Sequence, residues 1–440
     1  MEQNEQKKLK ILMAIDNYLP DVDGVVNCMH NYCMHSLDRV DLTALAPKNK
    51  KSYHDNFPYK ILRCASMKVP LLKVYYGFPD SDAQFKKILN ETDFDIIHIH
   101  SPFNMGKYCL KLARKKNKPI VATFHTNFRP IFQQTFQVES IAETAVKSLG
   151  AFYNKLDEIF VCSPVVEEQA RSFGYKGKVT YLPFGTEFEK CENVDELKAE
   201  FNKDHKTTED ELIFLYVGRL MELKRVDFII DCLKLLKDKG YKFKFYVVGK
   251  GMIEEELKKQ VKELDMQDCV IFPGFVPREK MPSYYARANL FLFPSLYDNF
   301  GLVKVEAAAF STPGLFIKDS AAAYGVTDNV NGYLCEDTKD AFCNRIIDAI
   351  SDRKHLHEVG INASNDLYCS WQQATDKVMD RLEEIAKNYV PKKKRNTSAE
   401  NKTKKIMKNA VIYRNNEKRY INAKKIKEKN LNRGKDKLSK

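Results

Sequence analysis

Two acidic residues and a small turn lie close together in the stretch SLYDNFGLVKVEAAAFSTPG, residues 295 to 314. Asp298 falls on an expected loop and Glu306 inside the expected helix that follows, with Gly301 and Leu302 at the helix start. Backbone amides at a helix start have no intrahelical acceptor and favour an anion. We therefore expect the amides to bind a phosphate, and the two acids to accept hydrogen bonds from hydroxyl groups beside it. The alternative is a capping acid followed by a solvated helix residue.

Positively charged residues follow another expected strand, in FLYVGRLMELKRVDF. Gly218 ends this strand, and Arg219 and Lys224 lie on the loop that leads into a helix. Two fixed cations beside a helix start form an anion site, and the glycine lets the backbone approach a ligand closely. Gly249 and Gly251 stand in the same strand-to-helix position in FYVVGKGMIEEEL. That second signal is weak by itself, because turns need glycine anyway.

Short apolar segments alternate with amphipathic ones along the chain, which predicts an α/β fold with doubly wound parallel sheets. In such sheets, binding sites lie at the carboxyl ends of the strands. The expected strands are Leu9–Ile15, Asp41–Ala46, Ile96–His100, Ile120–His125, Glu158–Cys162, Val179–Leu182, Leu212–Val217, Phe243–Val248, Val270–Ile271, Leu290–Phe293 and Gly314–Ile317. The expected helices are Val25–Leu37, Lys107–Lys115, Ile141–Asn154, Val165–Phe173, Val226–Lys237, Ile253–Leu264, Arg278–Ala286 and Ser370–Ala386.

The alternation stops over residues 187–210, a charged stretch with few apolar residues. We therefore predict a linker there, between a domain over residues 1–186 and another over residues 211–370, with a ligand in the cleft between them.

The net charge of +13 comes from the C-terminal residues of the chain. Residues 391–440 carry 19 Lys and Arg against 4 Asp and Glu, whereas residues 1–390 carry 53 against 55. We expect this tail to be disordered because it is poor in large apolar residues. A polybasic tail also suits an anionic membrane surface. Nucleic acid is the weaker interpretation, because the tail has few aromatic residues and the rest of the chain has no basic surplus.

The eleven cysteines are scattered, without a spacing that suits zinc, which is typical of a protein in a reducing cytosol. No run of about 18 apolar residues occurs, so we expect no membrane span. Asp80 and Asp82 form an Asp-x-Asp pattern, which we interpret as part of a turn rather than a metal site. We therefore expect a cytoplasmic protein without a metal.

The motifs GRLMELK and D-x-x-G-L-V-x-x-E-A, in this order and separation, resemble those of the retaining, nucleotide-sugar-dependent glycosyltransferases of family 4. LPDVDGVVN, DIIHIHSPFNMG, ATFHTNF and VTDNVNGYL agree, and the resemblance extends from residue 9 to about residue 388. It implies the GT-B fold, in which two Rossmann-like domains face a cleft. Residues 1–186 would bind the acceptor and residues 211–370 the nucleotide sugar, and a C-terminal helix over residues 371–390 would cross back to the first domain.

The resemblance also implies roles for single residues. Arg219 and Lys224 would bind the diphosphate, Glu306 the ribose and Asp298 a hydroxyl group of the transferred sugar, with His125 near the reacting face. The donor site would further include Gly24, Gly218, Gly249, Phe275, Phe300, Gly301 and Leu302. The chain departs from the family pattern in three places: Asp298 replaces a glutamate, Asn299 replaces a glycine, and Asp23–Gly24 stands where the family usually has two glycines.

This site needs no metal or cofactor, because fixed cations and helix amides can neutralise the departing diphosphate. The acceptor hydroxyl would attack on the face from which the phosphate leaves and would pass its proton to that phosphate. His125 would position or polarise the reacting groups. His98 and His100 are expected to pack or to anchor loops.

The acceptor is suggested by two segments that mix basic with aromatic or apolar residues, TFHTNFRPIFQQTF and CASMKVPLLKVYYGFP. They suit a surface that dips into a bilayer interface, although simple packing is the alternative. The chain is also similar to bacterial glycosyltransferases that glucosylate diacylglycerol, which implies UDP-glucose as donor and a lipid acceptor at the inner face of the cell membrane. The other possibilities are a glycosyltransferase for a surface polysaccharide or a protein, and a non-catalytic partner protein.

Overall fold

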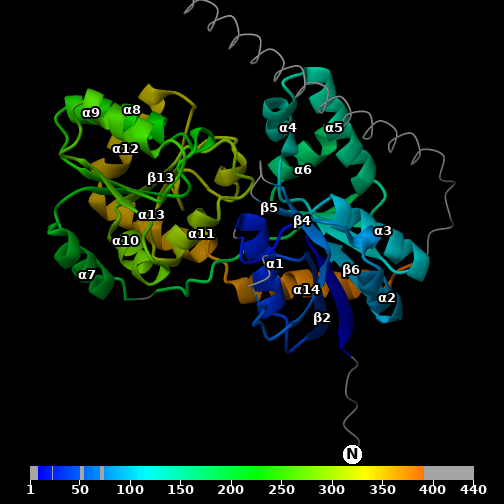
Figure 1. The fold of residues 1–440 in the computed structure, drawn as a ribbon. Coiled ribbons are helices and arrows are strands. Elements are labelled where there is room, and N and C mark those ends of the chain that lie inside the picture. Colours follow the sequence, from blue (N-terminus) through cyan, green and yellow to red (C-terminus); the bar gives the residue numbers. More distant parts are fainter. Residues whose placement is uncertain (1–7, 22, 50–53, 70–73, 192, 391–440) are drawn as a thin grey trace, which may run out of the picture. The chain divides into compact units, whose positions relative to one another are not determined.

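The structure is a computed structural model that describes residues 8–390 except 22, 50–53, 70–73 and 192 (Figure 1). Its first sheet is parallel throughout. The strand order is β3 (Lys60–Cys64), β2 (Val40–Pro47), β1 (Leu9–Ala14), β6 (Ile96–Ile99), β7 (Ile120–Thr123), β8 (Glu158–Val161) and β9 (Lys178–Tyr181). A short antiparallel hairpin, β4 (Ser66–Val69) with β5 (Val74–Gly77), stands apart from it. The order steps outward from β1 in both directions, as in a doubly wound sheet.

The second sheet is also parallel. Its order is β12 (Val270–Gly274), β11 (Lys244–Val248), β10 (Ile213–Val217), β13 (Leu290–Phe293), β14 (Gly314–Ile317) and β15 (Tyr333–Cys335). The two sheets therefore share one arrangement, and each has its own buried core. The predicted α/β fold class, with two Rossmann-like halves, is confirmed.

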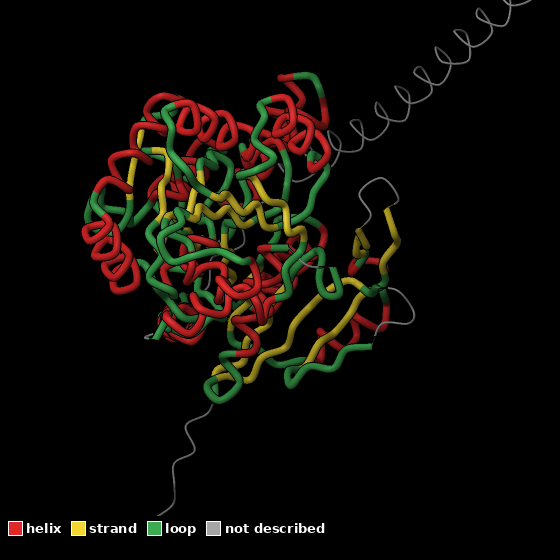
Figure 2. The backbone as a smooth tube through the Cα atoms, turned by 90° about the vertical axis from the view of Figure 1, so that its left-hand side faces the viewer, coloured by secondary structure: helices red, strands yellow, loops and turns green. Residues whose placement is uncertain are grey.

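Helices lie on both sides of the strands (Figure 2). Around the first sheet these are α1 (Gly24–Met34), α2 (Ala83–Glu91), α3 (Asn104–Lys116), α4 (Phe128–Phe136), α5 (Glu139–Tyr153) and α6 (Pro164–Ser172). Those that follow are α7 (Asp195–His205), α8 (Val226–Asp238), α9 (Glu254–Glu263), α10 (Met281–Arg287), α11 (Leu302–Ala309), α12 (Lys339–Ser351), α13 (Arg353–Asp366) and α14 (Trp371–Lys387), with short 3₁₀ turns η1 (Pro79–Ser81), η2 (Glu222–Lys224), η3 (Arg278–Lys280) and η4 (Ala321–Ala323). None of the described helices has the length and apolar composition needed to cross a membrane.

Local sequence explains most of these elements. The central strands β10 and β13 read IFLYV and LFLF and are almost wholly buried, as expected for parallel strands covered on both faces. Helix α6 begins with Ser163 as its N-cap and proline at its first position, and α14 begins with a capping box between Ser370 and Gln373. Asp82 caps α2 and Asp80 pairs with Lys111 at 2.5 Å, so the Asp-x-Asp pattern lies in a turn, as interpreted from the sequence.

The stretch predicted as a linker contains a helix. Helix α7 spans Asp195–His205, and its Phe201 is 1% exposed and packs edge-on against Tyr246 and Tyr284 of the second core. With DELKAEFNKDH as its sequence, α7 has only Leu197 and Phe201 as large apolar residues, four positions apart, and this is a short signal for a helix in a charged stretch. The other elements that were not predicted are β3, the β4–β5 hairpin, β15, α2, α4, α12 and α13. The basic tail, residues 391–440, lies outside the described residues, so each interpretation of it stays a prediction.

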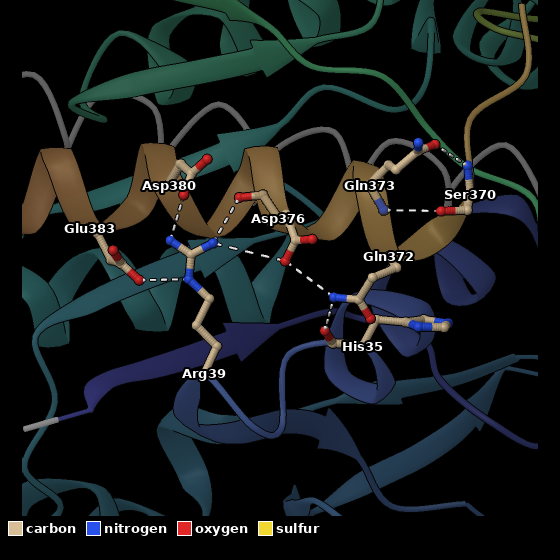
Figure 3. A network of polar contacts seen from close by, with 8 residues as sticks. All are labelled: His35, Arg39, Ser370, Gln372, Gln373, Asp376, Asp380 and Glu383. Atoms are coloured by element: carbon tan, nitrogen blue, oxygen red, sulfur yellow. Dashed lines mark hydrogen bonds and ion pairs between the residues drawn. The ribbon is translucent and has the colours of Figure 1, made fainter. Parts of the chain in front are cut away.

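The last helix belongs to the first core, although it follows the second sheet in sequence. Trp371, Val378 and Leu382 of α14 are buried among side chains of the first sheet and its helices. Figure 3 shows Arg39 extended toward α14, where its guanidinium donates to Glu383 at 2.8 Å and to Asp380 at 2.5 Å. The chain therefore returns to its first half, as the resemblance implied for this helix.

A second arginine contact of α14 should contribute more to stability than the Arg39 network. Arg381 donates to both oxygens of Glu158, at 3.0 and 2.6 Å, and that glutamate is 3% exposed. We expect Arg381→Ala to lower the free energy of unfolding by about 3 kcal/mol, because it leaves a buried carboxylate without its main partner. Arg39→Ala, at an exposed network, should lower it by about 1 kcal/mol.

Urea unfolding followed by fluorescence measures both variants, because Trp371 is the only tryptophan and lies in this core. An equal loss in the two variants would contradict the prediction.

Candidate active site

A cavity of about 420 Å³ lies where strands of the two sheets end. From the first sheet it is lined by the start of α1 and the segments after β7 and β9, and from the second by the segments after β10 and β13 and the start of α11. Its lining residues are Asp23, Gly24, Val25, Cys28, His125, Thr126, Asn127, Phe184, Val217, Gly218, Arg219, Lys224, Phe293, Tyr297, Asp298, Asn299, Phe300, Gly301, Leu302 and Val303. Most of the predicted site residues are thus brought together.

Two cations face this cavity. Arg219 is exposed, and its guanidinium has no ion-pair partner within the part of the chain that the structure describes. Lys224, at the end of η2, pairs with Asp298, and its ammonium also lies 5.8 Å from the centroid of the Phe293 ring. Arg219 is therefore available to bind an anionic ligand. Lys224 can bind such a ligand only if it gives up its ion pair with Asp298.

The loop before α11 fixes Asp298. The Ser295 hydroxyl donates to Asp298 Oδ2 at 2.5 Å and accepts the Asp298 amide at 3.3 Å, which closes a tight turn. Asp298 thus has a hydroxyl donor and an ammonium donor already. A sugar hydroxyl could bind it only beside these partners or in place of Lys224.

The start of α11 presents amides to the cavity. Gly301 caps the helix in a left-handed conformation with φ of 69°, and no side chain caps the amides that follow. A β-carbon at this position would be strained, and it would lie 3.1 Å from the Phe293 ring. Gly301, Leu302 and Val303 all line the cavity, so uncapped amides and two cations share one wall.

The start of α1 is different. Asp23 is the N-cap, and one of its carboxylate oxygens accepts the amides of Val25 and Val26 at 2.8 and 2.9 Å. These amides are therefore occupied by the chain's own carboxylate, at the place where the resemblance leads one to expect a glycine. Gly24 lines the cavity, but the start of α1 is less available to an anionic ligand than the start of α11.

His125 follows β7 and forms part of the opposite wall. Its Nε2 lies 2.9 Å from His100 Nδ1, its ring stacks on Phe184 at 5.5 Å, and its carbonyl oxygen accepts the Asn299 side-chain amide at 2.7 Å. Burial lowers the pKa of His125 to about 3. The imidazole is therefore neutral near pH 7, which suits positioning and polarisation more than proton abstraction.

The neighbouring histidines are buried. His98 Nε2 lies 2.7 Å from Thr123 Oγ1, in keeping with the packing role predicted for it. Cys28, His100 and His125 each offer a ligand atom within 4.8 Å of the others, an association that their positions in the sequence do not reveal. The hydrogen bond between His100 and His125 already uses one nitrogen of each ring.

Three residues predicted for the donor site do not line the cavity. Glu306 is half-buried and accepts the Tyr285 hydroxyl at 2.6 Å, and burial raises its pKa. Phe275 is 71% exposed. Gly249 packs on the backbone of Gly218, where a β-carbon would lie 1.9 Å from the Gly218 carbonyl oxygen, so this glycine serves the contact between two loops.

Other residues of the cavity were not predicted from the sequence, among them Tyr297, Thr126 and Phe184. Asn299 was noted only as a departure from the family pattern, yet its side chain joins the second half of the chain to His125. The signal for Thr126 was its position directly after His125, at the end of a predicted strand. Nothing local marks Phe184, because its contact with His125 is between distant segments.

Comparisons with known proteins match each half of the chain. Residues 22–190 match the family described as Glycosyltransferase Family 4, and residues 198–366 match the one described as Glycosyl transferases group 1. Two similar relatives are called alpha-monoglucosyldiacylglycerol synthase. The one from Streptococcus pneumoniae is 25% identical over 69% of this chain and 70% of its own, and the one from Acholeplasma laidlawii is 24% identical over 74% and 84%.

Solved structures give the same architecture. The crystal structure of HepE from Anabaena in complex with UDP superimposes with a TM-score of 0.68, at 17% identity, over 86% of this chain and all of that one. A sucrose-phosphate synthase from Thermosynechococcus elongatus gives the same TM-score at 19% identity, over 87% of this chain and all of that one. With both halves matched in order, and with two parallel sheets whose strand ends line one cavity, the chain belongs to the GT-B glycosyltransferases, with a family 4 half followed by a group 1 half.

Proposed function

We propose that this glycosyltransferase moves glucose from UDP-glucose to diacylglycerol, with retention of configuration, at the cytoplasmic face of a membrane. The proposal of a nucleotide-sugar donor is supported by one wall of the cavity, which combines Arg219, Lys224 and the uncapped amides at the start of α11. A departing nucleoside diphosphate develops negative charge as the sugar becomes cationic, and fixed cations and amides stabilise that charge with little rearrangement. No metal or cofactor is part of the proposal.

The donor has to replace the ion pair between Lys224 and Asp298. When the diphosphate pairs with Lys224, the carboxylate of Asp298 is released to accept a hydroxyl group of the transferred sugar. Ser295 keeps that carboxylate in place through the exchange, because its hydroxyl donates to the other oxygen. Uridine is proposed as the base because HepE, which has this fold, was solved with UDP and also with UDP and glucose.

The transfer step is proposed to use the leaving phosphate as its base. The acceptor oxygen bonds to the anomeric carbon as the bond from that carbon to the phosphate oxygen breaks, and the hydroxyl proton passes to the phosphate on the same face. Neutral His125 would orient or polarise the groups that react. Glu306 is proposed for the ribose. It would have to keep or exchange the hydroxyl of Tyr285 that it now accepts.

A lipid acceptor is supported by the names of the two synthases and by an apolar surface on the first half of the chain. In α4 no residue is fully buried, and Phe128, Phe132 and Phe136 form a row of half-buried rings 5.8 and 5.7 Å apart. Phe128 and Phe132 also pack against the first core, so only part of each ring is open to a bilayer. Val138 follows, with 45% of its surface exposed. An amphipathic helix with an aromatic face suits the interface of a bilayer. Part of the second segment noted in the sequence, residues 70–73, lies outside the described residues.

The direct test is incubation of the full chain with radiolabelled UDP-glucose, UDP-galactose or GDP-mannose and vesicles that contain diacylglycerol. We expect label from UDP-glucose to appear in a chloroform-soluble product with an α linkage. Label found only in a water-soluble glycan or in protein would overturn the lipid acceptor, and label from GDP-mannose alone would overturn the donor.

Arg219 provides a test of the donor wall. We expect Arg219→Ala to lower kcat/KM about 100-fold, because one fixed charge on the diphosphate is lost. Its melting temperature should stay unchanged, since the guanidinium has no ion-pair partner within the described residues. Arg353→Ala is the matched control, because Arg353 donates to the Asp210 carbonyl oxygen, away from the cavity. Equal activity of the two variants would contradict the prediction.

The apolar surface can be tested with two valines of equal exposure. We expect Val138→Asp to weaken sedimentation of the protein with anionic vesicles several-fold, because a carboxylate is excluded from the bilayer interface. Aspartate at this N-cap of α5 should not destabilise the helix, so unfolding would not explain the loss. Val330→Asp, also at 45% exposure but in the second half of the chain, should bind vesicles like the unmodified protein. Unchanged sedimentation of both variants would show that the surface near α4 does not contact the membrane.

A further inference from the structure

A lysine is buried behind the loop that forms the donor wall. Lys304 is the third residue of α11 and is 3% exposed. Its ammonium donates to the carbonyl oxygens of Ala322 and Tyr324, at 2.8 and 2.7 Å, and lies 5.1 Å from the centroid of the Phe300 ring. Within the described residues, no carboxylate pairs with it.

Such a cation is costly for the fold. A buried charge held only by neutral dipoles loses more hydration than its partners return, and the first turn of a helix disfavours positive charge. Burial lowers the pKa of Lys304 to about 8. The Cys162 thiol faces it, but burial raises the pKa of that thiol to about 12, so it stays neutral and does not compensate the charge near pH 8. Methionine would fill the same space without this cost.

The surroundings of Lys304 connect it to the cavity. Its two carbonyl partners belong to η4 and the residue after it, and a β-carbon at Gly301 would lie 3.6 Å from that of Ala322. Its aromatic neighbour, Phe300, lines the cavity and packs edge-on against Phe184 at 5.2 Å. Lys304 therefore fastens η4 to the turn that presents the uncapped amides of α11.

We propose that Lys304 is a positioning residue for the donor's diphosphate, which fixes this turn from behind and adds a third positive charge to the wall formed by Arg219 and Lys224. The proposal rests on the proposed function. A diphosphate in the cavity would compensate the buried charge that the free protein leaves uncompensated. Charges act over longer distances in a buried, weakly screened site than in water, so the ammonium does not need to touch the phosphate.

This role has a consequence for proton binding. An anion favours the protonated lysine, so UDP should raise the pKa of Lys304 above its value of about 8 in the free protein. Slightly above that pH, part of the lysine is deprotonated before binding, and the protein should take up a proton as UDP binds. The phosphate of UDP titrates near pH 6 and His125 near pH 3, both below this range.

The experiment is calorimetric titration of the full chain with UDP at pH 8.5, in buffers of different ionisation enthalpy, and again at pH 7. The unmodified protein should take up a fraction of a proton at pH 8.5. Lys304→Met should take up none and should bind UDP about tenfold more weakly at pH 7. Lys304→Arg should bind as tightly at pH 8.5 as at pH 7, because arginine stays charged.

Lys318→Met is the matched control, since that lysine is 53% exposed and pairs with Glu336. It should behave like the unmodified protein. Absence of proton uptake by the unmodified protein at pH 8.5 overturns the proposal even if Lys304→Met does not fold. Equal UDP affinity of Lys304→Met and the unmodified protein at pH 7 overturns it as well.

Failure of the proposed donor would look different. The same titrations with GDP and ADP distinguish a wrong nucleotide base from a wrong role for Lys304, because proton uptake depends on the diphosphate and not on the base. Binding of GDP alone, with uptake that Lys304→Met abolishes, would overturn UDP as donor and support Lys304 as the positioning residue. No binding by any of the three nucleotides would overturn both.

Discussion

The site depends on the contact between the loop after β13 and the strand ends of the first sheet. Asn299 donates to the carbonyl oxygen of His125 at 2.7 Å, and the thiol of Cys162 donates to the Asn299 carbonyl oxygen at 3.1 Å. Each sheet by itself offers only the polar groups at one set of strand ends. This loop carries Asp298 before Asn299 and the amides of α11 after it. The position of the loop therefore decides which of these groups face His125.

Charge in the cavity is balanced unevenly. Arg219 has no carboxylate partner within the described residues, Lys224 has Asp298, and Lys304 has only neutral partners. Of the three, Lys304 is the costly one, because it is buried without a carboxylate partner, whereas Arg219 is exposed and Lys224 is paired. The arrangement suits a negatively charged ligand. Without that ligand, Lys224 pairs with Asp298.

Two of the departures from the family pattern change contacts at the cavity. Asp23 closes the start of α1 with its own carboxylate, and Asn299 spans the cavity to the backbone of His125. The first makes one helix start less available to an anion, so more of the binding falls to α11. The second gives the donor loop a fixed partner on the opposite wall, where a glycine could not reach. The Asn299 contact therefore favours one defined position of the loop.

The sequence by itself determined the two parallel sheets, most central strands and the position of Arg219, Lys224, Asp298 and His125 at strand ends, because apolar runs and turn residues act locally. Tertiary structure alone decided the rest. Helix α7 has two large apolar side chains, Leu197 and Phe201, and only the second core reveals where they pack. The partners of Glu306 and Lys304, and the approach of Cys28 to His100 and His125, join segments far apart in sequence, and no local pattern records such contacts.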